Sequence, residues 1–331
     1  DLHELTHSFP TRRSSDLNTC EQVTAVPLEK EILRMTHGKS FIYCADAGLG
    51  SYNIRLFNSM GGRGFIVTQS VKKLGDILKQ AVFNDYDYRL LSNDVPVRIE
   101  HMKEFDRFDE DNRGLYEDFA YKVIPADHAM DLGLYEEKLL KNGKVQRVKA
   151  KGMLKQRVII TFSRKMMEYQ RTIRNRQIER AKNMLRRNDP EEIKKGPNDI
   201  RRFMKRIAMT KAGEKATVSY IIDEAKIAEE ERYDGYYAIA TNLEDSVHDI
   251  LAISRKRYLI EDCFRVMKTN FRSRPVNHSK PYRIKAHFLI CYTALLVYRL
   301  LECKLVDNAT PVTPLNLITT LKNLNVANIH D

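Results

Sequence analysis

The chain has few features that would place it outside the interior of a cell. Its five cysteines are scattered and include no CxxC pair, which argues against a disulfide framework or a zinc ribbon and is typical of a reducing cytosol. The longest apolar run, residues 288–298, is too short for a bilayer span, which needs about 20 residues. Internal repeats and low-complexity tracts are also missing. We therefore predict a cytoplasmic protein that contacts no membrane.

The first 17 residues lack any structural pattern. The stretch THSFPTRRSSDL, residues 6–17, shows no apolar period of a strand or a helix. It also lacks the apolar run, roughly 7–15 residues long, of a secretory signal. We interpret residues 1–17 as an artefactual leader that resembles a translated sequencing adapter joined to a truncated gene. Asp16 lies in this leader, outside any strand pattern, and we assign it no role.

Positive charge, in contrast, is abundant and concentrated. Residues 141–215 contain 24 Lys and Arg against 7 Asp and Glu, an excess of +17 that is larger than the net charge of +12 for the whole chain. A localised basic block is the usual electrostatic signature of a surface that binds DNA or RNA. A solvated face that keeps the protein soluble is the alternative interpretation.

Residues 163–187 of this block predict one long helix. Its buried stripe is expected to consist of apolar residues at helical spacing: Met166, Tyr169, Ile173, Ala181 and Met184. The remaining surface of the helix carries cations that are expected to follow a phosphate backbone: Arg171, Arg174, Arg180, Lys182, Arg186 and Arg187.

The order of the other patterns favours an α/β architecture, α+β overall. A helix, a buried strand, a helix capped by Ser51 and a second strand are expected in turn at residues 28–36, 40–46, 52–60 and 64–70. Such a strand–helix–strand unit is typical of α/β folds. Further strands are expected at 96–105, 144–152, 157–163 and 233–242, a helix at 199–208, and two long closing helices at 244–271 and 283–304. The last helix is apolar over most of its surface, which predicts that it is buried.

Two acidic residues stand out against this background. Asp46 ends the expected strand at 40–46, where open α/β sheets place ligand-binding groups. Glu261 lies in one polar row with Arg257 and Lys268, at 100° per residue along an ideal helix. The apolar stripe beside this row is expected to pack on a core: Ile253, Ile260, Phe264, Met267 and Phe271.

Geometry alone also allows a simpler interpretation of Glu261. With Arg257 it forms an ordinary i,i+4 ion pair, worth about 0.2–0.5 kcal/mol. Together with Asp46, however, Glu261 has the chemistry to bind Mg²⁺ (or Mn²⁺), a hard ion that prefers oxygen ligands. Two such ions can activate a water or a 3′-hydroxyl in phosphodiester cleavage, a mechanism that normally needs a third carboxylate.

These motifs resemble the DDE transposases of bacterial insertion sequences, in the branch with a Tyr-x2-Arg-x3-Glu-x6-Lys signature. Arg257, Glu261 and Lys268 match its last three positions, whereas Ser254 stands where the Tyr belongs. The strand end with the second catalytic Asp of the family appears as Ala45-Asp46-Ala47-Gly48-Leu49. Other segments match the same branch in the same order: residues 18–22, 65–73, 233–242 and 271–276.

The resemblance implies a ribonuclease-H-like core that is incomplete at its N-terminal strands. We expect part of this core at residues 18–71, a large basic insertion of mixed strands and helices at 72–242, and the helix of the catalytic Glu with the C-terminal helices at 243–331. The first Asp of the family is expected upstream of residue 18. The fragment is therefore expected to be catalytically incomplete. Asp234 is interpreted as structural, with a place near the site as the alternative.

By resemblance, Asp46 and Glu261 bind the metal, and Arg257 and Lys268 hold DNA phosphates near the cut. The implied function is Mg²⁺-dependent cleavage and strand transfer of an insertion sequence. Its partners would be double-stranded DNA, at transposon ends and target, and a second copy of the chain on paired ends, in the bacterial nucleoid. Two alternatives remain: a non-catalytic nucleic-acid-binding protein that uses residues 141–215, and a nuclease of the same fold that cleaves without joining strands.

Overall fold

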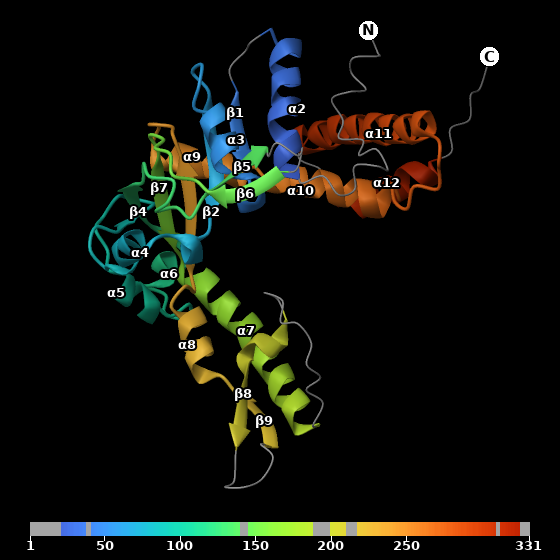
Figure 1. The fold of residues 1–331 in the computed structure, drawn as a ribbon. Coiled ribbons are helices and arrows are strands. Elements are labelled where there is room, and N and C mark those ends of the chain that lie inside the picture. The colour runs from blue at the N-terminus through green and yellow to red at the C-terminus, as the bar shows by residue number, and fades with distance from the viewer. Residues whose placement is uncertain are drawn as a thin grey trace, which may run out of the picture. The chain divides into compact units, whose positions relative to one another are not determined.

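The structure, a computed structural model, describes residues 21–37, 41–139, 145–187, 199–209, 217–308 and 312–324. The leader at 1–17 and Asp16 lie outside these residues. The chain mixes helices and strands, which confirms the α+β prediction (Figure 1). It divides into two compact units. One is Ala45–Glu244, here called the sheet unit, and the other comprises the residues before Ala45 and after Glu244, here called the helical unit.

A six-stranded sheet has the strand order β1-β2-β10-β7-β4-β3. The strands are β1 (Ile42–Ala45), β2 (Gly64–Gln69), β3 (Arg89–Leu90), β4 (Ala120–Pro125), β7 (Arg157–Phe162) and β10 (Tyr236–Thr241). β10 pairs antiparallel with both of its neighbours, so Ile239 lies opposite Thr68 on β2 and Ile159 on β7. The central strands are buried almost throughout, as expected for continuous runs of β-branched and aromatic residues.

Most strand predictions are confirmed, and two need correction. The expected strand at 40–46 forms as β1, but it lies at one edge of the sheet and Ile42 is exposed, so it is not a buried strand. The expected strand at 96–105 is wrong, because this segment forms helix α5 (Ile99–Glu104). Ile99 and Met102 are both buried at a spacing of three, which is a helical and not a strand spacing.

The sheet crosses the domain boundary expected at residues 71/72. β2 comes from the expected core segment, and its partner β10 comes from the expected insertion. Short helices connect the strands: η2 (Ala47–Leu49), α3 (Tyr52–Phe57), η3 (Val71–Lys73), α4 (Asp76–Phe83) and α6 (Arg113–Glu117). A separate hairpin is formed by β5 (Tyr135–Leu139) and β6 (Val145–Lys149).

The basic block is built around helix α7 (Arg164–Arg186), close to the predicted bounds. Its N-terminus is capped by Ser163, whose Oγ accepts from the N–H of Met166. Beside it lie η4 (Ile200–Phe203), the antiparallel pair β8 (Met204–Met209) and β9 (Thr217–Ile222), and α8 (Glu224–Glu231). The helix expected at 199–208 is wrong beyond the short turn η4, because pairing with β9 makes the second half of this segment, from Met204 on, a strand.

The buried face of α7 also differs from the prediction. Ala181 is buried as predicted, but Met166, Tyr169 and Ile173 are exposed. The other buried residues of the helix are Met167, Arg174 and Ile178. The prediction counted apolar residues only. The actual face includes a buried cation, whose partners are described below.

The helical unit contains α2 (Glu21–Met35), α9 (Val247–Arg255), α10 (Tyr258–Arg265), the π-helical turn η5 (Val266–Asn270), α11 (Pro281–Asp307) and α12 (Pro314–Asn323). The single helix expected at 244–271 is therefore wrong, because the chain breaks between α9 and α10 and changes its hydrogen bonding at η5. Of the polar row predicted on one straight helix, Arg257 and Glu261 still lie 3.8 Å apart, whereas Lys268 falls in the π-helical turn η5. In the expected apolar stripe, Met267 and Phe271 pack against the core of the helical unit as predicted, whereas Ile260 and Phe264 are exposed.

The core of the helical unit lies where η5, α11 and α12 meet. Val266, Leu295, Tyr298 and Leu317 form it. Figure 1 shows α11 and α12 side by side, in agreement with these contacts. The expected helix at 283–304 is confirmed as α11, but its burial is not, since Ile290, Val297 and Leu300 are exposed.

Candidate functional site

Asp46 follows β1 directly, and its carboxylate begins the turn η2. Its Oδ1 accepts hydrogen bonds from the N–H groups of Gly48 and Leu49, at 2.8 and 3.1 Å. Gly48 permits this approach, since a Cβ at this position would lie 3.0 Å from the same oxygen. The backbone thus holds an exposed carboxylate in one orientation at the end of a strand.

A buried arginine supports the loop that carries Asp46. The guanidinium of Arg55 donates from Nε to the carbonyl of Gly50 at 3.0 Å, from Nη2 to Oε1 of Gln69 at 2.8 Å, and from Nη1 to Oε1 of Gln156 at 3.0 Å. These oxygens are neutral, and burial lowers the pKa of Arg55. The loop also packs tightly on β2, because a Cβ on Gly50 would lie 2.3 Å from Val67.

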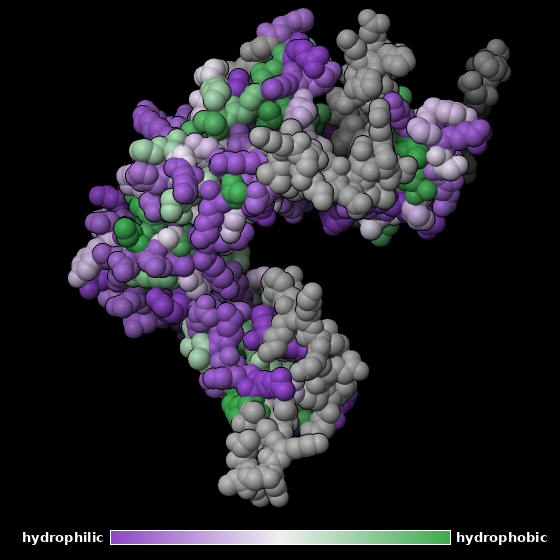
Figure 2. Space-filling view, in the orientation of Figure 1, coloured by the Kyte–Doolittle hydropathy of each residue, from purple (hydrophilic) through white to green (hydrophobic). Residues whose placement is uncertain are grey.

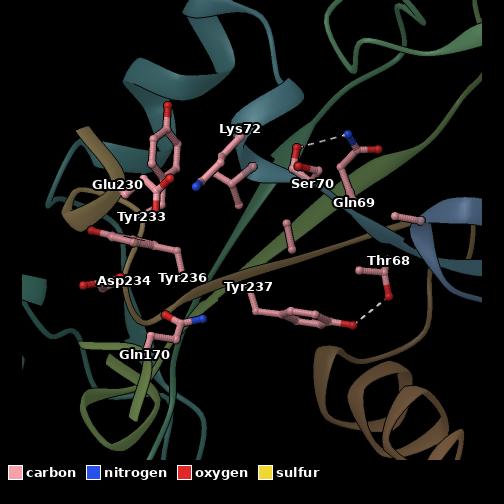
Figure 3. A pocket seen from close by; sticks show the side chains of 13 residues that line it. Thr68, Gln69, Ser70, Lys72, Gln170, Glu230, Tyr233, Asp234, Tyr236 and Tyr237 are labelled. Atoms are coloured by element: carbon pink, nitrogen blue, oxygen red, sulfur yellow. Dashed lines mark hydrogen bonds between the residues drawn. The ribbon is translucent and has the colours of Figure 1, made fainter. Parts of the chain in front are cut away.

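Ala47, the residue after Asp46, is one of the residues that line a cavity of about 340 Å³ (Figure 3). Its walls come from η2, β2, η3, α7, α8 and β10. Figure 3 shows Tyr237 extended toward Thr68, and their hydroxyl oxygens lie 2.7 Å apart. The ammonium of Lys72 lies 5.4 Å from the ring centroid of Tyr233. Aromatic rings and a cation thus line a cavity beside the Asp46 loop.

Asp234 also lines this cavity, but its carboxylate is engaged by arginine. Nη1 and Nη2 of Arg174 donate to Oδ1 and Oδ2 of Asp234 at 2.7 and 2.6 Å, and both side chains are only 6% exposed. Nη2 of Arg174 also pairs with Glu231 at 3.2 Å, and Arg171 approaches Asp234 at 3.5 Å. The geometry supports the structural interpretation of Asp234. The surface position predicted for Arg174 is wrong, because the helix uses this cation as an internal ion-pair partner.

The other predicted cations of α7 lie on its surface. Arg171, Arg180, Arg186 and Arg187 are exposed. Arg180 and Arg187 share the side opposite the buried face with Arg176, which the sequence reasoning missed although it stands one helical turn before Arg180. Arg176 and Arg187 are about 16 Å apart along the axis at 1.5 Å per residue. Figure 2 shows mainly hydrophilic residues around α7 and α8.

Glu261 lies in the first turn of α10, with a side chain that is 72% exposed. The Nε of Arg257 lies 3.8 Å from its Oε1, the i,i+4 pair that the sequence predicts. The neighbouring Asp262 ties α10 to α11 through a 2.5 Å contact with Arg299. Hydrogen bonds from Arg265 and from Arg299 lower the pKa of Asp262.

The remaining signature residues lie near this helix. Lys268 falls in η5, with its ammonium 5.7 Å from the ring centroid of Phe264. Burial raises the pKa of the Cys44 thiol on β1, the strand that precedes Asp46. The positive charge of Arg257 opposes part of this rise. Cys44 and Arg257 belong to the same unit of the chain.

The two predicted metal ligands belong to different units, Asp46 to the sheet unit and Glu261 to the helical unit. Both are exposed carboxylates, which suits a hard divalent cation. Within the described ranges, no three His, Cys, Asp or Glu side chains cluster in a way that could hold a metal ion. Each ligand fits the chemistry of Mg²⁺, but a complete ligand set is not formed by the described residues.

No protein-family model and no curated protein sequence matches the chain. None of the described helices is long and apolar enough to span a membrane, as predicted from the sequence. The function must be inferred from the motifs and geometry of the chain itself.

Proposed function

We propose that the chain is a DDE-type transposase of a bacterial insertion sequence, acting on double-stranded DNA in the bacterial nucleoid. The observation that carries this proposal is Asp46, an exposed carboxylate fixed by two backbone N–H groups directly after a strand. It stands in a motif that resembles the second catalytic Asp of that family. The Arg257-Glu261-Lys268 spacing supports the same assignment. The strand–helix–strand segment from β1 to β2 would then belong to a ribonuclease-H-like core.

Asp46 and Glu261 are the proposed ligands of Mg²⁺ or Mn²⁺. When bound, such ions would activate a water or a 3′-hydroxyl and stabilise the leaving oxygen. Asp46 contributes a carboxylate held by the backbone of Gly48 and Leu49. Because no third ligand is assigned, we expect this chain to bind DNA but to cut it poorly.

The exposed face of α7 is the proposed DNA contact. Arg176, Arg180 and Arg187 share one side of this helix. Arg186 extends the positive surface to one flank. Arg171 adds a cation on the side of α7 that approaches Asp234, and Arg257 and Lys268 are proposed to hold phosphates near Glu261. Arg174 is excluded from this set, because it is buried and paired with Asp234.

Metal binding by the purified chain tests the catalytic assignment. We expect Asp46→Asn and Glu261→Gln each to weaken Mn²⁺ binding, measured by calorimetry, by roughly tenfold or more. The Asn variant retains the Oδ1 acceptor that the turn requires, so a loss of metal affinity would report the charge and not the fold. Glu224→Gln, at an exposed carboxylate on α8, is the matched control. Unchanged affinity in both site variants would contradict the assignment.

A second candidate is a non-catalytic nucleic-acid-binding protein. The basic surface of α7 favours it directly, and it needs no metal cluster. Under this proposal, DNA affinity would depend on Arg176, Arg180 and Arg187 but would be the same with Mg²⁺ or EDTA. The calorimetric experiment separates the two candidates, because only the first requires Asp46 and Glu261 to bind a metal.

A further inference from the structure

The cavity beside the Asp46 loop is lined in part by aromatic rings that are held in place by other rings. Tyr233 and Tyr236 both meet the ring of Phe83 edge to face, with centroids 5.3 and 5.5 Å apart. Tyr236 also meets the ring of Phe162 at 5.1 Å. These contacts fix the orientation of two lining rings before any ligand arrives. A planar ring is the ligand shape that such a wall fits best, because aromatic rings stack or meet edge to face.

The charges in the cavity favour an anionic ligand. Of the two acidic side chains in its lining, Glu230 pairs with Arg202 at 3.1 Å. The other, Asp234, is joined to Arg174 by two hydrogen bonds. Both carboxylates are therefore neutralised by arginines from outside the lining. Among the described residues that line the cavity, Lys72 is the only cation, so a ligand with a negative charge would complement it.

Lys72 can bind an anion without leaving a carboxylate unpaired. Its ammonium lies 5.4 Å from the ring centroid of Tyr233, and Figure 3 shows the side chain extended toward this ring. The pKa of the nearby Glu229 is lowered mainly by a hydrogen bond from Lys226 at 2.7 Å, and the charge of Lys72 contributes less. Because Lys226 is the main partner of Glu229, Lys72 can turn to a ligand at little cost.

Neutral polar groups lie on the side of the cavity opposite Lys72 (Figure 3). The side-chain oxygen of Gln170 accepts a hydrogen bond from the N–H of Gly235 at 2.8 Å. This bond fixes the carboxamide, and Figure 3 shows its nitrogen on the side of Tyr237. The hydroxyl oxygens of Tyr237 and Thr68 lie 2.7 Å apart. An amide donor and two hydroxyls thus face a ligand whose negative charge lies at Lys72, and they suit a polar substituent at its other end.

We propose that this cavity binds a small aromatic carboxylate, with its carboxylate at Lys72, its ring against Tyr233 and Tyr236, and a polar substituent toward Gln170. The volume of about 340 Å³ is near the lower end of the range for ligand sites, roughly 300–1,000 Å³, which suits a single ring better than a nucleotide. Ala47 also lines the cavity, so the ligand would contact the loop of Asp46. Binding needs neither DNA nor metal, so it stands apart from the proposed function.

Calorimetric titration of the purified chain with 4-hydroxybenzoate, without DNA or metal, tests the site. We expect a dissociation constant below about 1 mM and binding that is roughly tenfold weaker in Lys72→Met, because the carboxylate loses its cation. Lys73→Met, at an exposed lysine outside the lining, is the matched control and should bind as the unchanged chain does. Circular dichroism shows whether each variant folds. A dissociation constant well above 1 mM, or equal affinities in the two lysine variants, would overturn the proposal.

Three further probes test the class of ligand. 4-Hydroxybenzamide lacks the charge and cyclohexanecarboxylate lacks the planar ring, so each should bind roughly tenfold more weakly than 4-hydroxybenzoate. Thymidine monophosphate combines a ring with a phosphate, and tighter binding of this nucleotide would overturn the assignment to an aromatic carboxylate. Equal affinity for all the probes would overturn it as well. With 4-hydroxybenzoate bound, amide hydrogen exchange should slow at residues 68–72 and 233–238, and slowing elsewhere only would contradict the placement of the ligand.

Discussion

Each unit of the molecule contains an arginine–aspartate pair, and the two pairs differ in their surroundings. In the sheet unit, Arg174 and Asp234 are both 6% exposed and joined by two hydrogen bonds. In the helical unit, Arg299 and Asp262 are 23% and 18% exposed, with a contact of 2.5 Å. We therefore expect the second pair to contribute less to the free energy of unfolding than the first, because solvent screens its charges more.

The same contrast extends to the apolar residues. The sheet unit buries its β-branched runs on β2, β7 and β10, and it also buries Arg55 and Arg174 with hydrogen-bond partners. The helical unit has a small core and leaves Ile290, Val297 and Leu300 exposed. Periodicity shows which residues share a face, but it does not show what covers that face.

The largest effect is expected from the buried pair. Arg174→Ala should lower the free energy of unfolding by about 3–5 kcal/mol, because it leaves the Asp234 carboxylate buried without its main partner. Urea denaturation would measure this loss. Arg176→Ala, two residues away and exposed, should change stability by less than about 0.5 kcal/mol. Equal losses in the free energy of unfolding for the two substitutions would contradict the claim that the buried Arg174 supports the fold and the exposed Arg176 does not.

The next effect concerns the loop of Asp46. Arg55→Met should cost about 2–3 kcal/mol, since Gln69 and Gln156 would each lose a buried donor. Amide hydrogen exchange at Gly48 and Leu49 should accelerate, because the loop loses its anchor at the carbonyl of Gly50. Faster unfolding without any change at these two amides would show that Arg55 supports the sheet but not the loop.

The basic face of α7 should control DNA affinity without affecting stability. Changing Arg176, Arg180 and Arg187 to Gln should reduce the slope of log affinity against log salt by roughly 3, at about 0.9 for each phosphate contact. Fluorescence anisotropy at several salt concentrations would measure it. A control with three exposed cations from elsewhere, Arg34, Lys103 and Arg113, should retain the slope. A similar fall in both triple variants would mean that net charge, and not this face, binds DNA.

The smallest effect is expected from the half-buried pair, Arg299 and Asp262. The pKa of Asp262 is lowered in the fold, so the ion pair contributes stability above the ordinary pKa of Asp, about 3.9, and loses it as the pH falls through the lowered value. Asp262→Asn should therefore destabilise the chain at neutral pH by less than about 1 kcal/mol. Its effect should vanish in strong acid. A constant difference between the two proteins from pH 7 to pH 2 would contradict this linkage.

Sequence patterns predicted the central strands and the span of α7, because continuous β-branched runs and a long helical repeat leave few alternatives. The buried face of α7 was predicted incorrectly. Arg174 is buried because it pairs with Asp234, which is 60 residues away in the sequence, and no local pattern indicates this pairing. The segment at 96–105 was misread because its apolar spacing fits two periods. The crossing of the expected 71/72 boundary depends on long-range pairing of β2 with β10, which local patterns do not show.

The candidate site divides in the same way. Asp46 could be found from the sequence because it ends a strand and precedes a small-residue turn. Arg55, which anchors that turn, carries no signal of its own: an arginine in a short helix usually faces solvent. Arg176 was overlooked although its spacing to Arg180 is visible in the sequence.

Metal-directed cleavage of the protein itself tests the proposed metal site most directly. Fe²⁺ that is bound in place of Mg²⁺ reduces added H₂O₂ to hydroxyl radicals, which cut the backbone close to the metal ligands, and ascorbate reduces the Fe³⁺ back to Fe²⁺. We expect cuts next to both Asp46 and Glu261 that Mg²⁺ suppresses by competition and that disappear together in Asp46→Asn and in Glu261→Gln. Cuts at one residue only, or at neither, would contradict a shared metal site and with it the proposed transposase chemistry.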